Sequence, residues 1–388
     1  MDFGILVVIV LAGLGGPLLG VLARRFVPVV IGEILAGILA GPAVLHAVDP
    51  STRIVSALAE IGFAMLMLTA GMHLPLRDRR LLSSARRGAL LAAMVCVLSV
   101  PAALAAASIG GSGHAAIYAV VLASGSAAVL LPAIEELGLE GAAVLTAMAQ
   151  VTLADIITIL SVPIVLQPER VGHAVLGGAL VAAGAVALFL GVRLLAGHDW
   201  VHRVRHLSKQ RFWALDLRMS LLVLFALAWI AQKGGTNVLI AGFAAGLMVA
   251  VVGGPKRLST QMRGVADGFF VPLYFVVLGA RLDLGGLVRD PTMLAFAAAL
   301  ATLNLAVHLL AGALARQPPA AALAATAQLG VPAAVASLGL SEHLLSPVIA
   351  TAIVASAVVS LATSTAGVEL LARANPSPGV RESSTAPS

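Results

Sequence analysis

The chain has 388 residues, of which 60% are hydrophobic and 11% charged, with a net charge of +6 and a mean hydropathy of +1.03. Because soluble domains are about 45–50% apolar and about 25% charged, this composition excludes a soluble globular enzyme. The single cysteine, Cys96, excludes a disulfide framework and a cysteine-based metal or iron–sulfur site. The sequence predicts an all-α polytopic membrane protein.

Apolar runs interrupted by charge, glycine or proline predict about thirteen transmembrane helices, each needing about 20 residues. In chain order the runs cover residues 4–23, 27–46, 54–74, 88–109, 114–134, 142–166, 172–192, 219–232, 236–252, 268–280, 292–315, 319–340 and 344–371. The tail after them, residues 373–388, contains several proline and serine residues and is expected to be disordered and cytoplasmic.

The distribution of basic residues predicts the topology. Most of the 24 Lys and Arg residues lie in the loops that follow odd-numbered spans or in the tail. The positive-inside rule then places the N-terminus outside and the C-terminus in the cytoplasm. The basic segment 193–218 is expected to be an amphipathic connector lying on anionic lipid rather than a nucleic-acid site. We therefore expect the lipid bilayer, and no nucleic acid, as a partner.

Two stretches of the sequence recur in the same order. Residues 35–41 resemble residues 240–246, and residues 62–74 resemble residues 268–282 at nearly the same separation. Because this separation contains seven spans, an odd number, the second copy enters the membrane upside down. We therefore predict two inverted six-helix repeats joined by a connector helix. The predicted division is repeat 1 at about 4–166, the connector at 172–192 and repeat 2 at about 219–371.

The same separation relates Ser124, Gly125 and Ser126, in the middle of span 5, to Gly330 and Pro332 in span 12. Glycine, serine and proline at membrane depth favour interrupted helices. The half-helix ends of such an interruption expose backbone carbonyls to a cation and N–H groups to a carboxylate. We therefore predict crossed discontinuous helices at spans 5 and 12.

Asp155 lies in the middle of span 6, where an ionisable side chain is costly unless it has a function. Thr152 precedes it by three residues and shares its helical face. A carboxylate at this depth is stabilised by either a proton or a cation, so competition between them suffices to exchange one for the other. Asp155 and Thr152 are the predicted ion- and proton-binding residues. The alternative is a carboxylate that only joins helices by hydrogen bonds.

Other polar residues lie within or near the predicted spans. His308 and Asn304 share a face of span 11, and His308 is interpreted as either a pH gate or a packing residue hydrogen-bonded in its own helix. Glu33 and Glu60 lie nearer the ends of spans 2 and 3 and are expected to be structural or vestibule residues. No motif for catalysis, zinc or nucleotide binding occurs in a suitable context, so neither an enzyme nor a cofactor is predicted.

Three motifs are distinctive: residues 32–42 followed by Val44-Leu45, residues 61–72, and residues 269–283. Together they resemble the cation:proton antiporter superfamily, specifically its Kef-like and Nap-like sodium/hydrogen exchanger branch. The resemblance covers about residues 1–372. It implies a secondary antiporter of the bacterial inner membrane that exchanges Na⁺ or K⁺ for H⁺. It further implies a homodimer whose core domain moves like an elevator around crossed helices, with Asp155 matching the family's ion-binding aspartate.

Two positions depart from the family's pattern. Ala154 stands where the family usually has Asp, Asn or Gln, and His308 stands near the position of the family's Lys or Arg. With one core carboxylate, one cation replaces one proton, so exchange is expected to be electroneutral. The departures leave two alternatives open. One is a non-transporting, regulatory paralogue, and the other is a sodium-coupled organic-anion symporter of related architecture.

Overall fold

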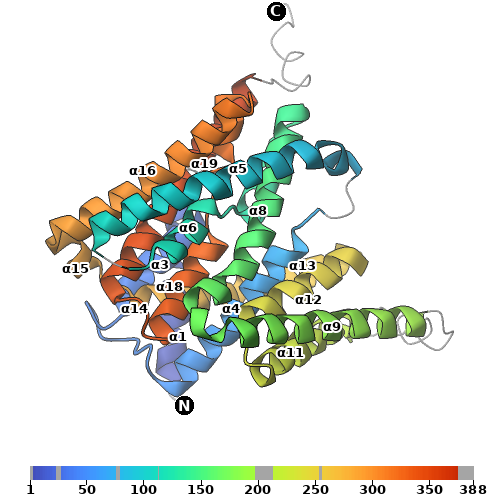
Figure 1. The fold of residues 1–388 in the computed structure, drawn as a ribbon. Helices are drawn as coiled ribbons and strands as arrows, with labels where there is room; N and C mark the ends of the chain where they lie inside the picture. Colours follow the sequence, from blue (N-terminus) through green and yellow to red (C-terminus); the bar gives the residue numbers. More distant parts are fainter. Residues whose placement is uncertain are drawn as a thin grey trace, which may run out of the picture. The chain divides into compact units, whose positions relative to one another are not determined.

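The computed structural model describes residues 3–22, 28–75, 79–111, 113–196, 213–252 and 256–374. These residues form helices and their connections, and no strand occurs among them (Figure 1). Most of the basic segment 193–218 and nearly all of the tail 373–388 lie outside the described residues. The predictions for both segments therefore stay predictions.

The helices follow the predicted apolar runs. They are α1 (Phe3–Gly13), α2 (Gly15–Leu22), α3 (Val29–Ala40), α4 (Arg53–Met72), α5 (Arg79–Gly110), α6 (Ala115–Ala123), α7 (Ala127–Glu136), α8 (Ala142–Leu166), α9 (Val171–Ala196), α11 (Leu215–Lys233), α12 (Val238–Val252), α13 (Lys256–Val265), α14 (Val271–Arg281), α15 (Leu284–Arg289), α16 (Pro291–Leu314), α17 (Pro319–Ala324), α18 (Gly330–Ser341) and α19 (Pro347–Ala374). In the described part of the chain, ten helical segments are long and apolar enough to cross a membrane. Since α3, α12 and α18 are shorter apolar helices, the count of thirteen spans stays a prediction.

Near the tenth predicted span the helix begins earlier than expected. The prediction began at residue 268, whereas α13 starts at Lys256 and continues through a π-helical turn, Ala266–Phe270, into α14. Hydropathy places the start of the span too late in the chain, because most residues of α13 are polar. Its buried residues Leu258 and Met262, four apart, instead give it one apolar face.

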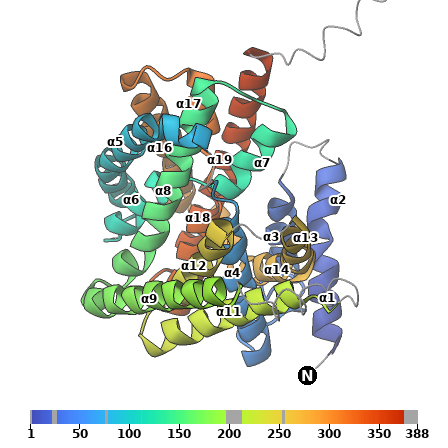
Figure 2. The ribbon, with the colours of Figure 1, turned by 90° about the vertical axis from the view of Figure 1, so that its right-hand side faces the viewer.

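The chain divides into two compact units. The first unit contains α1–α4, α9 and α11–α14, and the second contains α5–α7, most of α8, and α15–α19. Each unit therefore combines helices from both predicted repeats, with the early spans of each repeat in the first unit and the late spans in the second. Within the first unit, α9 and α11 lie side by side (Figures 1 and 2).

Glycines bring helices of the first unit into backbone contact. A Cβ on Gly37 of α3 would collide with the carbonyl of Val276 in α14, and one on Gly246 of α12 would collide with the carbonyl of Leu68 in α4. Small residues of this kind let membrane helices approach closely enough for van der Waals attraction to hold them together. Gly242, the counterpart of Gly37 in the recurring stretch, likewise faces the carbonyl of Ala64 in α4, so the α3–α14 and α12–α4 contacts are equivalent under the predicted repeat.

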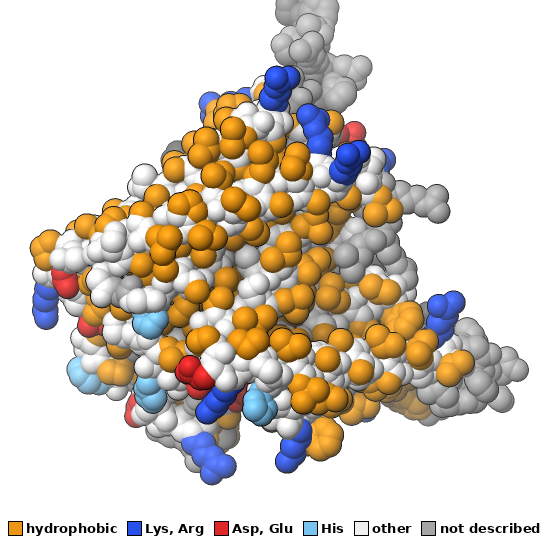
Figure 3. Space-filling model, viewed as in Figure 1, with side chains coloured by type: hydrophobic (Ala, Val, Ile, Leu, Met, Phe, Trp, Pro, Cys, Tyr) orange, Lys and Arg blue, Asp and Glu red, His pale blue; other side chains and the backbone are white. Residues whose placement is uncertain are grey.

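In the second unit, α5 and α16 pack against each other and present an apolar surface (Figure 3). The exposed apolar residues on this pair include Leu90, Val97, Val100, Leu104, Leu294, Leu310 and Leu314. Lys and Arg side chains are sparse on this surface and gather near the end at which α5 begins (Figure 3). A hydrophobic flank with basic residues at one end is the pattern of helices that face lipid. The interrupted helices α6–α7 and α17–α18 belong to the same unit.

Candidate ion-binding site

The first interrupted helix is broken at residues 124–126, between the end of α6 and the start of α7. Ser124 and Ser126 have extended backbones, with ψ angles of 151° and 95°. The Ser124 hydroxyl donates to the carbonyl of Val121 at 2.7 Å. A Cβ on Gly125 would lie 3.0 Å from the backbone oxygen of Val151 in α8, so this glycine lets the unwound segment pass close to α8.

Asp155 lies on α8 beside this break and is only 2% exposed. The backbone N–H of Ala127, the first residue of α7, donates to Asp155 Oδ2 at 3.2 Å. The first N–H groups of a helix have no partner within it, and the helix dipole places partial positive charge there. The start of α7 therefore both binds and electrostatically stabilises the carboxylate. The sequence located Asp155 and the break separately, and the structure brings them together.

Two buried oxygens of α8 have no hydrogen-bond partner. Thr152 is 3% exposed and lies one turn before Asp155, and its Oγ1 is unpaired. Gln150 is 2% exposed, and its Oε1 is also unpaired. Thr158, one turn after Asp155, differs because its hydroxyl donates to the Ala154 carbonyl at 2.7 Å. Unpaired hydroxyl and amide oxygens are suitable ligands for a hard cation. Thr152 shares the helical face of Asp155, whereas Gln150, five residues before Asp155, lies about 140° around the helix from it.

The second interrupted helix is broken at residues 325–329, between α17 and α18. Gln328 lies in this break and is 1% exposed. Its Nε2 donates to the carbonyl of Val121, in the last turn of α6, at 2.7 Å, and to Asn304 Oδ1 at 2.8 Å. Asn304 Nδ2 in turn donates to the Thr326 carbonyl and the Ser360 hydroxyl. Uncharged amides thus connect the two interrupted helices.

Gln328 was missed by the sequence analysis, which placed the second break at Gly330 and Pro332. These two residues instead lie in the first turn of α18. The N–H groups of a first turn need no helical partner, so proline is tolerated there and does not interrupt the helix. The break precedes both residues.

His308 is buried on α16, and its Nδ1 lies 3.0 Å from the Asn304 carbonyl in its own helix. This is the geometry expected of a packing histidine, and the pH gate stays a prediction. Glu33 and Glu60 belong to the first unit. Glu33 is buried with Oε2 unpaired, whereas the exposed Glu60 accepts from Gln232 Nε2 at 3.3 Å.

These features define a membrane protein with a buried carboxylate beside an interrupted helix. Comparison with known proteins identifies its family. The family model described as "Sodium/hydrogen exchanger, transmembrane" matches residues 6–373. The chain belongs to this family of antiporters, which confirms the resemblance inferred from the sequence motifs.

Several relatives and a solved structure agree with this assignment. The chain is 24% identical over 291 residues to the Na(+)/H(+)-K(+) antiporter GerN of Bacillus cereus, covering 74% of each protein. It is 23% identical over 293 residues to YjbQ of Bacillus subtilis, covering 71% of this chain but only 47% of YjbQ, so the chain spans about half of that relative. The sodium proton antiporter MjNhaP1 from Methanocaldococcus jannaschii shares the fold, with a TM-score of 0.62, 16% identity, and coverage of 95% of this chain and 96% of MjNhaP1.

Proposed function

We propose that the chain exchanges a monovalent cation, Na⁺ or K⁺, for H⁺ across a bacterial inner membrane, and that both ions bind at Asp155. Membership of the antiporter family supports this proposal, and GerN, whose name includes both cations, supports carrying K⁺ as well as Na⁺. The observation that carries the proposal is the Asp155 carboxylate, buried at the start of α7.

The environment of Asp155 supports exchange in physical terms. An ionised carboxylate out of water is strongly disfavoured unless a positive partner compensates it, and one N–H donor provides only part of that compensation. A proton or a cation completes it, and one site cannot hold both. The unpaired hydroxyl of Thr152, which shares a helical face with Asp155, would help to coordinate the dehydrated cation, whereas a bound proton does not require it.

Direct competition has a kinetic signature. In the pH range where the proton occupies most sites, each unit of acidification should raise the cation concentration for half-maximal exchange about tenfold, since the competent fraction falls tenfold. Cation-dependent proton flux in vesicles measures this dependence. A half-maximal concentration that does not change with pH would contradict a shared site.

We further propose that exchange is electroneutral. Asp155 is the only buried carboxylate in the described part of the second unit, and Ala154 precedes it. The other break contains the uncharged amide of Gln328, which is bonded to the uncharged amide of Asn304 on α16. One cation therefore replaces one proton, and transport should not respond to an imposed membrane potential. A net current on a supported membrane that scales with turnover would contradict this stoichiometry.

The division into two units supports an elevator-type mechanism. All residues assigned to the ion site belong to the second unit, so this unit would carry the ion while the first unit forms a homodimer in the bilayer.

The basic loops support an N-terminus outside and a C-terminus in the cytoplasm. Thirteen spans in two inverted repeats remain our proposed topology, supported by the equivalent glycine contacts of the first unit.

The decisive experiment is Asp155→Asn in proteoliposomes, with Na⁺, K⁺, Li⁺ or choline added in turn. The asparagine can still accept from the Ala127 N–H, so the protein should fold, while exchange should be abolished. Glu135→Gln, which neutralises an exposed carboxylate of the same unit, is the matched control and should retain exchange. Substantial exchange by Asp155→Asn would exclude this site. A wild-type protein inactive with every cation would instead support the non-transporting paralogue, and sodium-driven uptake of an organic anion would support the symporter.

A further inference from the structure

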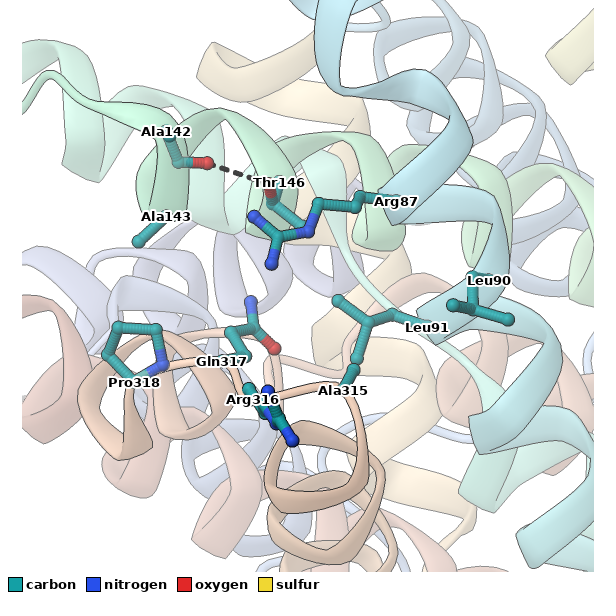
Figure 4. A pocket seen from close by; sticks show the side chains of 10 residues that line it. All are labelled: Arg87, Leu90, Leu91, Ala142, Ala143, Thr146, Ala315, Arg316, Gln317 and Pro318. Carbon is teal, nitrogen blue, oxygen red and sulfur yellow. Dashed lines mark hydrogen bonds between the residues drawn. The ribbon is translucent and has the colours of Figure 1, made fainter.

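A cavity of about 240 Å³ lies in the second unit, where α5, the start of α8 and the connection between α16 and α17 meet (Figure 4). Arg87, Arg316, Gln317 and Leu90 are among the residues that line it. Thr146, also in its wall, lies on α8 roughly 13 Å along the helix axis from Asp155, at about 1.5 Å per residue. The cavity is therefore separate from the ion site.

The cavity is electrostatically positive. Arg87 and Arg316 are exposed, and neither forms an ion pair with any described residue. No carboxylate lines the cavity. Ala142 and Ala143, in the first turn of α8, also border it, and the dipole of this long helix adds partial positive charge at that end. Together these groups favour an anion.

The cavity also contains a buried amide without a partner. Gln317 is 9% exposed, and both its Oε1 and its Nε2 lack hydrogen bonds. Figure 4 shows Gln317 and Arg87 directed toward one another across the cavity. A buried amide left unpaired destabilises a protein, whereas an oxygen-rich ligand that reaches it would accept from its N–H groups.

Arg316 lies just after the end of α16, in a left-handed backbone conformation. Its φ is +54°, and the following residue, Gln317, donates its N–H to the Gly312 carbonyl at 2.8 Å, which closes the end of α16. Glycine is the usual residue at this left-handed position, because other side chains are strained there. Ala214 has a similar φ of 49°, so the strain alone assigns no role to Arg316, but the turn places Arg316 and Gln317 together in the cavity wall.

We propose that this cavity binds a phosphate group, namely the head group of an anionic phospholipid. Two guanidinium groups and an amide N–H match the oxygens of a phosphate. Leu90 supports a lipid source, since it lines the cavity yet is 55% exposed. Leu310 and Leu314 of α16 are exposed as well and belong to the apolar surface of the α5–α16 pair, which would accommodate an acyl chain. The bound head group would connect α5, α8 and the α16–α17 connection, and so fasten the unit that carries the ion site.

The test uses the purified full-length protein in a neutral detergent. It is titrated with phosphatidylglycerol, with phosphatidylcholine of the same acyl chains, and with inorganic phosphate. Lipid retention in native mass spectrometry and the thermal unfolding midpoint are measured. Wild type should retain phosphatidylglycerol and unfold at a higher temperature with it than with phosphatidylcholine. The double variant Arg87→Gln/Arg316→Gly should bind phosphatidylglycerol about tenfold more weakly or worse, since each basic residue contributes to the attraction.

Two further variants separate binding from folding. Arg86→Gln removes an exposed neighbouring arginine that does not line the cavity, and it should bind as wild type does. Gln317→Met removes the unpaired amide, so it should raise the midpoint without lipid and reduce the lipid-dependent rise. Arg316→Gly itself relieves the strained backbone, so loss of binding in the double variant would not reflect misfolding.

The outcomes distinguish the sources of phosphate. Equal stabilisation by inorganic phosphate would retain the phosphate site and overturn its assignment to lipid. No anion-dependent shift in wild type would overturn the site altogether, and so would equal weakening by Arg86→Gln and by the double variant.

Discussion

The two interrupted helices of the second unit differ in what occupies their ends. At the first break the start of α7 meets the Asp155 carboxylate, whose charge can be neutralised by different ions. At the second break Gln328 and Asn304 are uncharged and bind the carbonyls of Val121 and Thr326. The carboxylate at the first break can therefore change its partner, whereas the amides at the second break have permanent ones. Neutral amides hold the two helices together without competing for the cation.

The largest effect on stability is expected from Gln328→Leu, which removes the hydrogen bonds that join the two interrupted helices. The variant leaves Asn304 Oδ1 unpaired in the protein interior, at a cost of about 1–3 kcal/mol, and it also removes one donor from the Val121 carbonyl, which keeps the Ser124 hydroxyl. Denaturant unfolding of the purified protein measures it. Gln150→Leu is the matched control, because the Oε1 of that equally buried glutamine has no partner to lose. Equal stability of the two variants would show that Gln328 does not join the helices.

Thr152→Val tests the proposed ion site at the first break, where Thr152 lies one turn from Asp155. The hydroxyl is unpaired in the protein, so its loss should leave stability unchanged or higher but remove a cation ligand. We expect the cation concentration for half-maximal exchange to rise about tenfold, which corresponds to about 1.4 kcal/mol. Thr158→Val, whose hydroxyl is bonded within its own helix, should leave that concentration unchanged. If both variants shift it alike, Thr152 is not a ligand.

His308→Leu tests whether the buried histidine of α16 acts as a pH gate. The bond of Nδ1 to the Asn304 carbonyl lies within α16, so we expect a loss of about 1 kcal/mol in stability and an unchanged pH profile of exchange. Proton flux measured across the pH range gives the profile. A profile flattened on its acid side would instead establish His308 as a pH gate.

The smallest effect on stability is expected from Pro332→Ala, which tests whether the second break lies before Pro332. Because Pro332 lies in the first turn of α18, alanine fits the same conformation, and stability should fall by about 1 kcal/mol or less. Gly125→Ala is the contrasting variant at the first break. Its Cβ would meet Val151 at 3.0 Å, so it should be clearly less stable than Pro332→Ala in the same unfolding assay.

The sequence was sufficient for the features that composition and local pattern determine. Hydropathy located the apolar helices, and the cost of charge in lipid singled out Asp155. Glycine and serine at membrane depth marked residues 124–126. Sequence reasoning did not find Gln328, because its partner Val121 is distant in the chain and no periodicity records such a bond. The second break was misplaced because Gly330 and Pro332 were taken as helix breakers, whereas both are compatible with a helix start.

The glycines of the first unit predict an uneven tolerance to mutation. At Gly37 and Gly246 the atom that a new side chain would strike is a backbone oxygen, which no change of rotamer can move aside. Random mutagenesis should therefore find few acceptable replacements there. The oxygens around Asp155 belong to side chains, which substitution can alter one at a time. A lineage of such proteins could acquire new ion preferences around Asp155 while these two glycines stayed unchanged.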